Sequence, residues 1–233
     1  MSAPLTLITP TGDRPWAWTL CQRWMAAQDY PGAVHWIVVD DGPVPQEVAF
    51  SRSGWQVEVL RPQPYWQEGQ NTQARNLCAA IDRVIPGAPV LIIEDDDHYA
   101  PYWLSVAAAA LEQHELIGET CMLYYNVHYR QWFQHRNTAH ASLCATGVRG
   151  LALAALRAFC TPQIRYADLE LWRGYCGRSL LFPGARVTGI KGLPGRTGIC
   201  QGHQRNYLSS QPDAEGQVLR DRLGVDAEVY LAG

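Results

Sequence analysis

A short, wholly apolar run in the middle of the chain ends in four consecutive acidic residues. Residues 91–93 read Leu-Ile-Ile, and Glu94, Asp95, Asp96 and Asp97 follow them directly. The apolar run predicts a strand buried in the centre of a sheet, and the acids would then lie at its carboxyl end. Four neighbouring carboxylates repel one another unless a cation lies among them, and Mg²⁺ and Mn²⁺ prefer such oxygen ligands. The pattern therefore favours a metal site over the alternative, a solvated acidic turn.

Strand-like and helix-like patterns alternate through the first half of the sequence. The predicted strands are residues 5–9, 34–39, 56–60 and 90–93, and the predicted helices are residues 15–27, 72–84 and 101–113. Such alternation predicts an α/β fold, with helices on both faces of a mostly parallel sheet. The remainder is less periodic: it predicts short strands at 122–125 and 132–134, helices at 151–159 and 168–176, and a glycine-rich loop over 183–206.

The length of 233 residues suits one continuous domain with three parts. We expect an α/β half over residues 1–115, a smaller second half over residues 116–206 and a C-terminal tail over residues 207–233. No apolar run approaches the roughly 18 residues that indicate a membrane span, and no signal peptide is evident at the start. Seven scattered cysteines without a C-x-x-C pair predict reduced thiols, as in a cytoplasmic protein.

The formal net charge is −3, but it is divided unevenly along the chain. Residues 1–120 hold 6 basic and 15 acidic side chains, a balance of −9. Residues 121–210 hold 11 basic side chains against Asp168 and Glu170 alone, a balance of +9. The acidic half suits a metal ion, whereas the basic stretch favours a polyanionic partner.

Five short segments, spread along the chain, together form a recognisable set of motifs. In chain order they are residues 9–11 (T-P-T), 38–42 (V-V-D-D-G), 74–76 (A-R-N), 94–101 (E-D-D-D-x-x-x-P) and 167–172 (A-D-L-E-L-W). Their order and spacing resemble the inverting glycosyltransferases of the GT-A fold, especially those of family 2, over roughly residues 4–205. The sequence departs from the family's pattern at Pro43, Glu94 and Ala167, where the family usually has Ser, Asp and Glu.

The resemblance implies a Rossmann-like GT-A domain whose acidic segment holds the diphosphate of a nucleotide sugar. It assigns Asp96 to the divalent cation, Mn²⁺ or Mg²⁺, and Asp95 to the ribose. Asp97 would touch the cation directly or through water, with a capping role as the alternative. A cation at this place stabilises the negative charge that builds on the diphosphate when the bond to the sugar breaks.

The resemblance also implies that residues 1–115 bind the nucleotide of a UDP-sugar through three further side chains. Asp41 would accept the imide N–H of uracil, although an Asp-Asp-Gly segment is also common in ordinary turns. Thr9 would contact the same nucleotide, and Arg75 would contact the nucleotide or its phosphates. A surface position or a salt bridge is the alternative for Arg75.

The second half would form the smaller acceptor-side subdomain, with Asp168 as general base. Asp168 would take the proton of the attacking acceptor hydroxyl, and direct attack with one base implies inversion at the anomeric carbon. A role as helix N-cap is the alternative. Later in the chain, His203 would join the cation, with no ligand role as the alternative. Lys191, Arg196 and Arg205 would meet phosphates.

The basic stretch bears on the identity of the acceptor. Ten arginines and Lys191 are interspersed with aromatic residues, a combination that suits phosphates and stacked bases. We therefore predict DNA that carries hydroxymethylated pyrimidines, as for small viral enzymes of this kind, with the base turned out of the duplex. A polysaccharide or glycolipid acceptor is the alternative. A binding module without turnover and a nucleotidyltransferase are further alternatives. The expected location is the cytoplasm, that of the host if the protein is viral.

Overall fold

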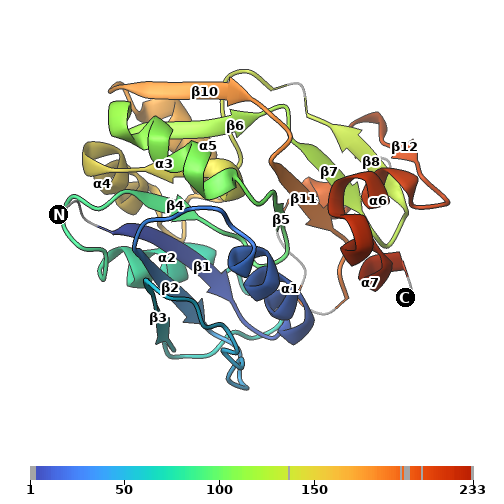
Figure 1. The fold of residues 1–233 in the computed structure, drawn as a ribbon, viewed down its shortest axis with the longest axis horizontal. Coiled ribbons are helices and arrows are strands. Elements are labelled where there is room, and N and C mark those ends of the chain that lie inside the picture. Colours follow the sequence, from blue (N-terminus) through green and yellow to red (C-terminus); the bar gives the residue numbers. More distant parts are fainter. Residues whose placement is uncertain (1–3, 136, 195, 197–199, 206, 232–233) are drawn as a thin grey trace.

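The computed structural model describes residues 4–135, 137–194, 196, 200–205 and 207–231. It contains a large sheet flanked by helices and a smaller sheet beside it (Figure 1). The N-terminus lies at the far end of the large sheet, and the C-terminus lies beside the small one. The predicted fold class, an α/β fold built on a mostly parallel sheet, is confirmed.

The large sheet has seven strands in the order β10-β6-β9-β4-β1-β2-β3. In chain order these are β1 (Leu5–Thr11), β2 (Val34–Asp40), β3 (Trp55–Leu60), β4 (Val90–Ile92), β6 (Leu116–Thr120), β9 (Thr146–Val148) and β10 (Ser179–Pro183). Strands β1 to β4 run parallel to one another, β10 is parallel to β6, and β9 is antiparallel to both of its neighbours. Strands β4, β1 and β2 are therefore adjacent, and their carboxyl ends share one edge of the sheet.

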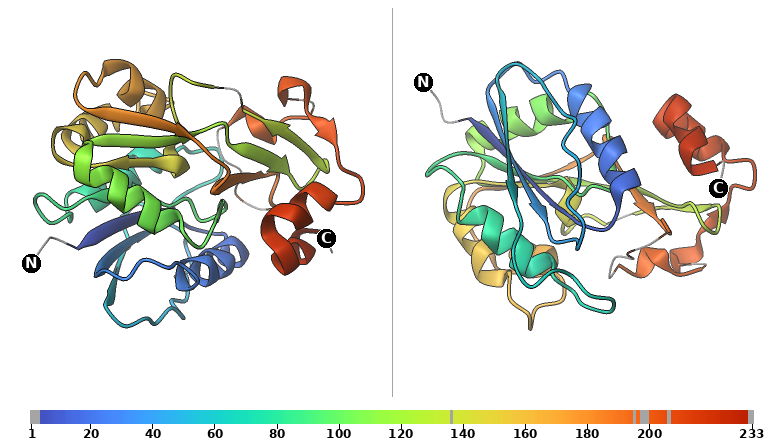
Figure 2. Two further views of the ribbon diagram at one scale, coloured as in Figure 1. Left: turned by 45° about the horizontal axis from the view of Figure 1, so that its top comes forward. Right: turned by 90° about the horizontal axis from the view of Figure 1, so that it is seen from below.

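Helices cover both faces of the large sheet (Figure 2). On one face lie α1 (Pro15–Ala26) and α3 (Trp103–Gln113), and on the other lie α2 (Gln73–Ile81), α4 (Gly150–Phe159) and α5 (Ala167–Gly174). The central strands supply apolar side chains to both layers, because successive residues of a strand point to opposite faces. In β2, Trp36 and Val38 join the first layer, and Ile37 and Val39 join the second. Burial on both faces explains why these strands are continuous apolar runs in the sequence.

The smaller sheet has five strands in the order β12-β8-β7-β11-β5. They are β5 (His98–Tyr99), β7 (Leu123–Asn126), β8 (Gln131–Gln134), β11 (Val187–Lys191) and β12 (Gln211–Pro212). The segment that follows β4 in sequence thus leads directly into the second sheet through β5. Strand β11 pairs with both β5 and β7, which places this part of the basic stretch next to the acidic segment.

The C-terminal tail is packed against the rest of the protein in its described part. It forms α6 (Gln217–Leu223) and α7 (Ala227–Leu231) beside the small sheet (Figure 1). Trp24 Nε1 in α1 donates a hydrogen bond to Asp226 Oδ2 at 2.9 Å, and Arg130 donates to the Leu231 carbonyl at 2.8 Å. Within the described ranges, none of the helices combines the length and the apolar character that crossing a membrane requires.

The strands and helices predicted within residues 1–115 are confirmed, with small differences at their ends. The prediction of a loop over residues 183–206 is wrong for part of that range, because β11 lies within it. Gly189 accounts for the error: a Cβ at this position would lie 2.5 Å from the ring of Tyr124. A glycine that admits an aromatic ring within a strand looks like a loop residue in the sequence. Strands β6, β9 and β10 had no predicted counterpart, and they complete the large sheet from the second half of the chain.

Leu77 and Leu151 provide a matched test of the helical layer formed by α2 and α4. Leu77 in α2 is 1% exposed and packs in the core, whereas Leu151 in α4 is 72% exposed. We expect Leu77→Ala to lower the free energy of unfolding by about 3 kcal/mol, because it leaves a cavity in the core. Leu151→Ala should change it by less than about 0.5 kcal/mol. Urea denaturation measures both values, and equal losses would contradict this packing.

Candidate active site

Three neighbouring strands deliver polar side chains to one edge of the large sheet. Strand β1 ends at Thr11, β2 is followed by Asp41, and β4 is followed by the acidic segment that begins at Glu94. Because these strands are parallel and adjacent, their carboxyl ends lie together. Gly12 permits the close approach of the first two ends: its φ is +146°, and a Cβ there would lie 2.5 Å from Asp41 Oδ1.

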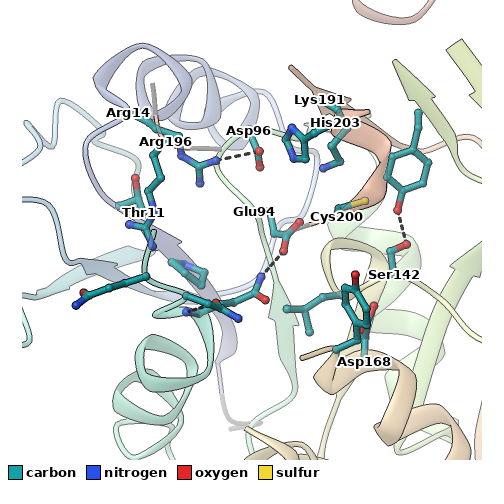
Figure 3. A pocket seen from close by; sticks show the side chains of 17 residues that line it. Thr11, Arg14, Glu94, Asp96, Ser142, Asp168, Lys191, Arg196, Cys200 and His203 are labelled. Carbon is teal, nitrogen blue, oxygen red and sulfur yellow. Dashed lines mark hydrogen bonds and ion pairs between the residues drawn. The ribbon is translucent and has the colours of Figure 1, made fainter. Parts of the chain in front are cut away.

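A cavity of about 190 Å³ opens at this edge, and both sheets contribute to its wall (Figure 3). Thr11 reaches it from β1, Tyr124 from β7 and Lys191 from β11. Five of the residues predicted from the sequence line it: Asp96, Asp168, Lys191, Arg196 and His203. Side chains that are far apart in the sequence are therefore gathered around one space.

Asp96 is an ionised acid that opens on this cavity. It is 6% exposed, and Arg14 donates a hydrogen bond to its Oδ2 at 2.9 Å. Burial works to raise the pKa of Asp96, but the positive charges of Arg14 and Lys191 outweigh burial and hold the pKa below its ordinary value. An ionised carboxylate beside a cavity is well suited to a divalent cation.

Asp95 is fully buried behind the cavity wall and is bound by the protein itself. Thr11 Oγ1 donates to Asp95 Oδ2 at 2.6 Å, and Arg14 donates to Asp95 Oδ1. Burial raises the pKa of Asp95 to about 6, with Arg14 acting in the opposite direction. Contact with a ribose would therefore require Asp95 to share an oxygen with these donors.

Glu94 and Asp97 differ from Asp96 in their surroundings. Glu94 lines the cavity, but burial, followed by the charge of Asp97, raises the pKa of Glu94 well above its ordinary value. Asp97 is fully buried, and its Oδ1 accepts hydrogen bonds from Lys191 Nζ at 3.0 Å and from the Ile190 amide at 2.9 Å. Asp97 therefore ties the acidic segment to β11 and orients Lys191.

Asp41 is enclosed by four donors. Oδ2 accepts hydrogen bonds from Thr72, from Arg75 at 3.1 Å and from Asn76 at 2.8 Å, and Oδ1 accepts one from Arg196 at 2.5 Å. Burial works to raise the pKa of Asp41, but these hydrogen bonds outweigh burial and lower it. The A-R-N segment and the loop after β11 therefore meet at one ionised carboxylate.

Thr9 and Arg205 lie elsewhere. Thr9 is fully buried, and its Oγ1 accepts a hydrogen bond from Trp36 Nε1 at 2.9 Å within the core. Thr11, two residues later, reaches the cavity instead. Arg205 is exposed and is not part of the cavity wall. The structure thus brings Arg75 to Asp41, as described above. The predicted residues that are not part of the cavity wall are Thr9, Asp41, Arg75, Asp95, Asp97 and Arg205.

His203 lines the cavity near Asp96 and Lys191 (Figure 3). Burial, followed by the charge of Lys191, lowers the pKa of His203 to about 4, so the ring is neutral. The Gly192 amide donates a hydrogen bond to His203 Nδ1 at 3.2 Å. A neutral imidazole that accepts at Nδ1 carries its proton on Nε2. In this arrangement Nε2 is a donor, and it could bind a cation only after the ring released the Gly192 amide.

Asp168 lies across the cavity from Asp96 (Figure 3). Helix α5 begins at Ala167, so Asp168 lies in its first turn and the capping position belongs to Tyr166. Burial raises the pKa of Asp168, although hydrogen bonds with the backbone, including that of Leu143, act against the increase. A carboxylate of raised pKa in a cavity wall is a stronger base than an exposed one, which suits proton abstraction.

One further group of possible metal ligands adjoins the cavity through Glu94. Ligand atoms of Glu94, Asp97 and Cys144 lie within 4.8 Å of one another. Burial, followed by the nearby carboxylates, raises the pKa of the Cys144 thiol well above its usual value, and a protonated thiol is a poor ligand. Lys191 already neutralises Asp97. Within the described part of the chain, Asp96 is therefore the carboxylate that best fits a divalent cation.

Arg14, Tyr124 and Ser142 also line the cavity, although they were not predicted. The hydroxyl groups of Tyr124 and Ser142 are hydrogen-bonded to each other, and Lys191 Nζ lies 5.5 Å from the centroid of the Tyr124 ring. Arg14 closely follows the first strand, so the rule that ligands bind at carboxyl ends of strands could have indicated it. The other two carry no such signal, because their placement depends on long-range packing.

Comparison with known proteins identifies the fold. No protein-family model matches the chain, and no curated protein sequence matches it. The solved structure of S. aureus TarS matches 80% of this chain and 36% of its own, with 15% identity and a TM-score of 0.53. Residues 1–349 of TarS in complex with UDP-GlcNAc match 84% of this chain and 59% of that chain, with 15% identity and a TM-score of 0.52.

A third similar structure is the mannosyltransferase PcManGT from Pyrobaculum calidifontis in complex with GDP-Man and Mn²⁺. It matches 84% of this chain and 59% of that chain, with 14% identity and a TM-score of 0.54. The chain thus spans from 36% to 59% of the length of these three structures. At these identities the likeness establishes a shared fold, the one used by this mannosyltransferase.

The charges around His203 can be tested one at a time. We expect its imidazole to titrate with a midpoint near pH 4 in the folded protein, well below that of an exposed histidine. Lys191→Met should raise this midpoint, because the ammonium group opposes a second positive charge, whereas Asp96→Asn should lower it. NMR titration of the His203 ring protons measures all three values. Shifts in the same direction for both variants would contradict the arrangement.

Proposed function

We propose that this protein is an inverting glycosyltransferase that moves a sugar from a UDP-sugar to an acceptor hydroxyl. The observation that carries the proposal is the composition of one cavity. An ionised carboxylate, Asp96, and a more basic carboxylate, Asp168, line it together with the cations Lys191 and Arg196. The shared fold adds support, because similar structures hold UDP-GlcNAc or GDP-Man.

The donor diphosphate would bind beside Asp96, Lys191 and Arg196. Lysine and arginine form charged hydrogen bonds with phosphate oxygens. Asp96 would hold Mn²⁺ or Mg²⁺, with phosphate oxygens as further ligands, and such an ion supplies positive charge as the leaving group departs. Asp97 would act through Lys191, which it orients. His203 would become a second ligand of the ion once its ring releases the backbone amide.

Asp41 is fully buried and is not part of the cavity wall, so the uridine would reach its carboxylate once Arg196 turns from Asp41 to the diphosphate. An ionised carboxylate can accept the imide N–H of uracil, a donor that cytosine lacks, and this favours UDP over CDP. Arg75 would contact the same nucleotide, because it is bonded to Asp41. Thr11 would take the role first assigned to Thr9, since it reaches the cavity. Asp95 would meet the ribose at an oxygen shared with the protein's own donors.

Transfer would proceed by a single displacement. Asp168 accepts the proton of the acceptor hydroxyl while the hydroxyl oxygen attacks the anomeric carbon. The bond between that carbon and the diphosphate oxygen breaks, and its electron pair leaves with the diphosphate. Attack opposite the leaving group inverts the anomeric configuration. The position of Asp168 across the cavity from Asp96 supports this assignment (Figure 3).

The acceptor is best explained as a neutral hydroxyl compound such as a glycan. Within the described part of residues 121–210, five cations pair with carboxylates of the chain, which balances part of the positive charge internally. They are Arg157, Arg173, Arg186, Lys191 and Arg196. Hydroxymethylated DNA is the second candidate, favoured by the exposed side chains of Arg205 and Tyr129, which is 41% exposed.

Asp168→Asn tests the proposed base while it keeps the size of the side chain. We expect sugar transfer to fall by at least about 100-fold, the usual contribution of a general base. The affinity for UDP should stay within about twofold, because the base acts on the acceptor and not on the donor. Product analysis by mass spectrometry and calorimetry with UDP measure the two quantities.

Glu170→Gln is the matched control, because Glu170 lies in the same helix and pairs at the surface with Arg173 at 3.1 Å. It should transfer sugar at the wild-type rate. The raised pKa of Asp168 also predicts that the rate increases with pH through a midpoint above that of an ordinary aspartate, as the base ionises. Near-normal transfer by Asp168→Asn would refute the assignment of the base.

Salt distinguishes the two acceptors. Contact with six DNA phosphates would lower acceptor affinity by roughly 10³-fold between about 50 and 200 mM salt, because released counterions oppose binding. We expect the shallow response of a neutral glycan, since five of the described cations already pair with carboxylates of the chain. The assay supplies UDP-sugars and Mn²⁺ with either hydroxymethylated DNA or a glycan panel, and mass analysis identifies the product. A steep response together with a new sugar-bearing nucleoside would establish DNA instead.

A further inference from the structure

Arg14 bridges two of the four acids that follow β4. It lies in the connection between β1 and α1, and its side chain is 14% exposed. One terminal nitrogen donates to Asp95 Oδ1, and the other donates to Asp96 Oδ2 at 2.9 Å. The third donor atom, Nε, is buried and has no hydrogen-bond partner among the residues that the structure describes. Arginine does not lose its proton in proteins, so this charge is permanent.

This guanidinium competes with any cation at Asp96. Arg14 lines the same cavity and occupies one oxygen of the carboxylate that would hold the divalent cation (Figure 3). Like charges repel strongly at such short range in a partly buried site, where water screens them poorly. Lys191, bonded to the adjacent Asp97, adds a second fixed charge. A divalent cation alone should therefore bind weakly to this protein.

A nucleoside diphosphate would change the balance. Its phosphate oxygens carry negative charge, and guanidinium groups form charged, often bidentate hydrogen bonds with phosphate. The unpartnered Nε of Arg14 is a donor that the two carboxylates leave unused. If the guanidinium turned toward a diphosphate in the cavity, Asp96 Oδ2 would become available to the cation.

We propose that Arg14 is an exchangeable counter-ion of this site. In the nucleotide-free protein it is paired with both Asp95 and Asp96, and it passes to the donor diphosphate when nucleotide and divalent cation bind together. The inference rests on the proposed function and assigns Arg14 a positioning role within it. The site would then take up cation and nucleotide as a pair. The diphosphate draws away Arg14, whose charge repels the cation, and the cation balances Asp96, whose charge repels the diphosphate.

Mn²⁺ binding to Arg14→Gln tests this role without any measurement of catalysis. Free Mn²⁺ is followed by electron paramagnetic resonance, with and without UDP, for the wild-type protein and the variant. We expect the variant to bind Mn²⁺ at least about tenfold more tightly than wild type in the absence of UDP, within the usual range of such coupling. The gain in Mn²⁺ affinity on adding UDP should shrink in the variant, because Arg14 no longer has to be displaced.

Arg186→Gln is the matched control for loss of a buried ion pair. Arg186 donates to the fully buried carboxylate of Glu119 at 2.8 Å, and neither residue is part of the cavity wall. It should lower thermal stability but leave Mn²⁺ affinity at the wild-type value. Arg14→Lys serves if Arg14→Gln does not fold: its single ammonium group cannot serve both carboxylates as the guanidinium does, so Mn²⁺ affinity should be intermediate.

The possible failures are distinct. If neither Arg14 variant binds Mn²⁺ more tightly than wild type without UDP, while all proteins bind it with UDP, the exchange is refuted and the proposed function stands. If no protein binds Mn²⁺ even with UDP, the cation site of the proposed function fails, and the role of Arg14 falls with it.

Discussion

The balance of buried charge at the carboxyl end of β4 is the constraint on which the rest of the structure depends. Asp95 and Asp97 are fully buried, and Asp96 is nearly so. Buried carboxylates without partners destabilise a protein by several kcal/mol each, so this edge of the sheet requires cations from elsewhere in the chain. Arg14 arrives from the connection after β1, and Lys191 arrives from the end of β11. Charge balance therefore links the acidic half of the sequence to the basic half.

The same link explains why the cavity lies where the two sheets meet. Strand β5 follows the acidic segment and pairs with β11, and the Ile190 amide and the Lys191 ammonium group both bond to Asp97. The loop after β11 then brings Arg196 to Asp41 and His203 to the cavity. Carboxylates that follow β2 and β4 thus face cations from the second half, with Asp168 on the opposite wall (Figure 3). An arrangement of this kind suits a charged leaving group on one side and a proton acceptor on the other.

The sequence was sufficient for the fold class and for placing acidic residues at the carboxyl ends of β2 and β4, because both depend on local patterns. Apolar runs define β1, β2 and β4, and the polar residues after them necessarily share an edge. The sequence did not reveal β11, because Gly189, which makes room for the Tyr124 ring, looks like a loop residue. It did not reveal Arg14 either, because the carboxylates that Arg14 contacts lie about eighty residues away in the sequence. Thr9 was misplaced for another reason: Thr9 and Thr11 point to the same face of β1, but Thr9 lies within the strand and is buried, whereas Thr11 at the carboxyl end reaches the cavity. The sequence also could not show how far the basic stretch is paired internally, since its ion pairs form only in the folded chain.

The most direct test of the account is a crystal structure of this protein with Mn²⁺ and UDP. The account requires the cation within about 2.2 Å of a carboxylate oxygen of Asp96, bridged to the diphosphate. It also requires Lys191 and Arg196 at phosphate oxygens and the uracil against Asp41. A nucleotide bound away from Asp96, or one that leaves the cavity between Asp96 and Asp168 unfilled, would contradict it.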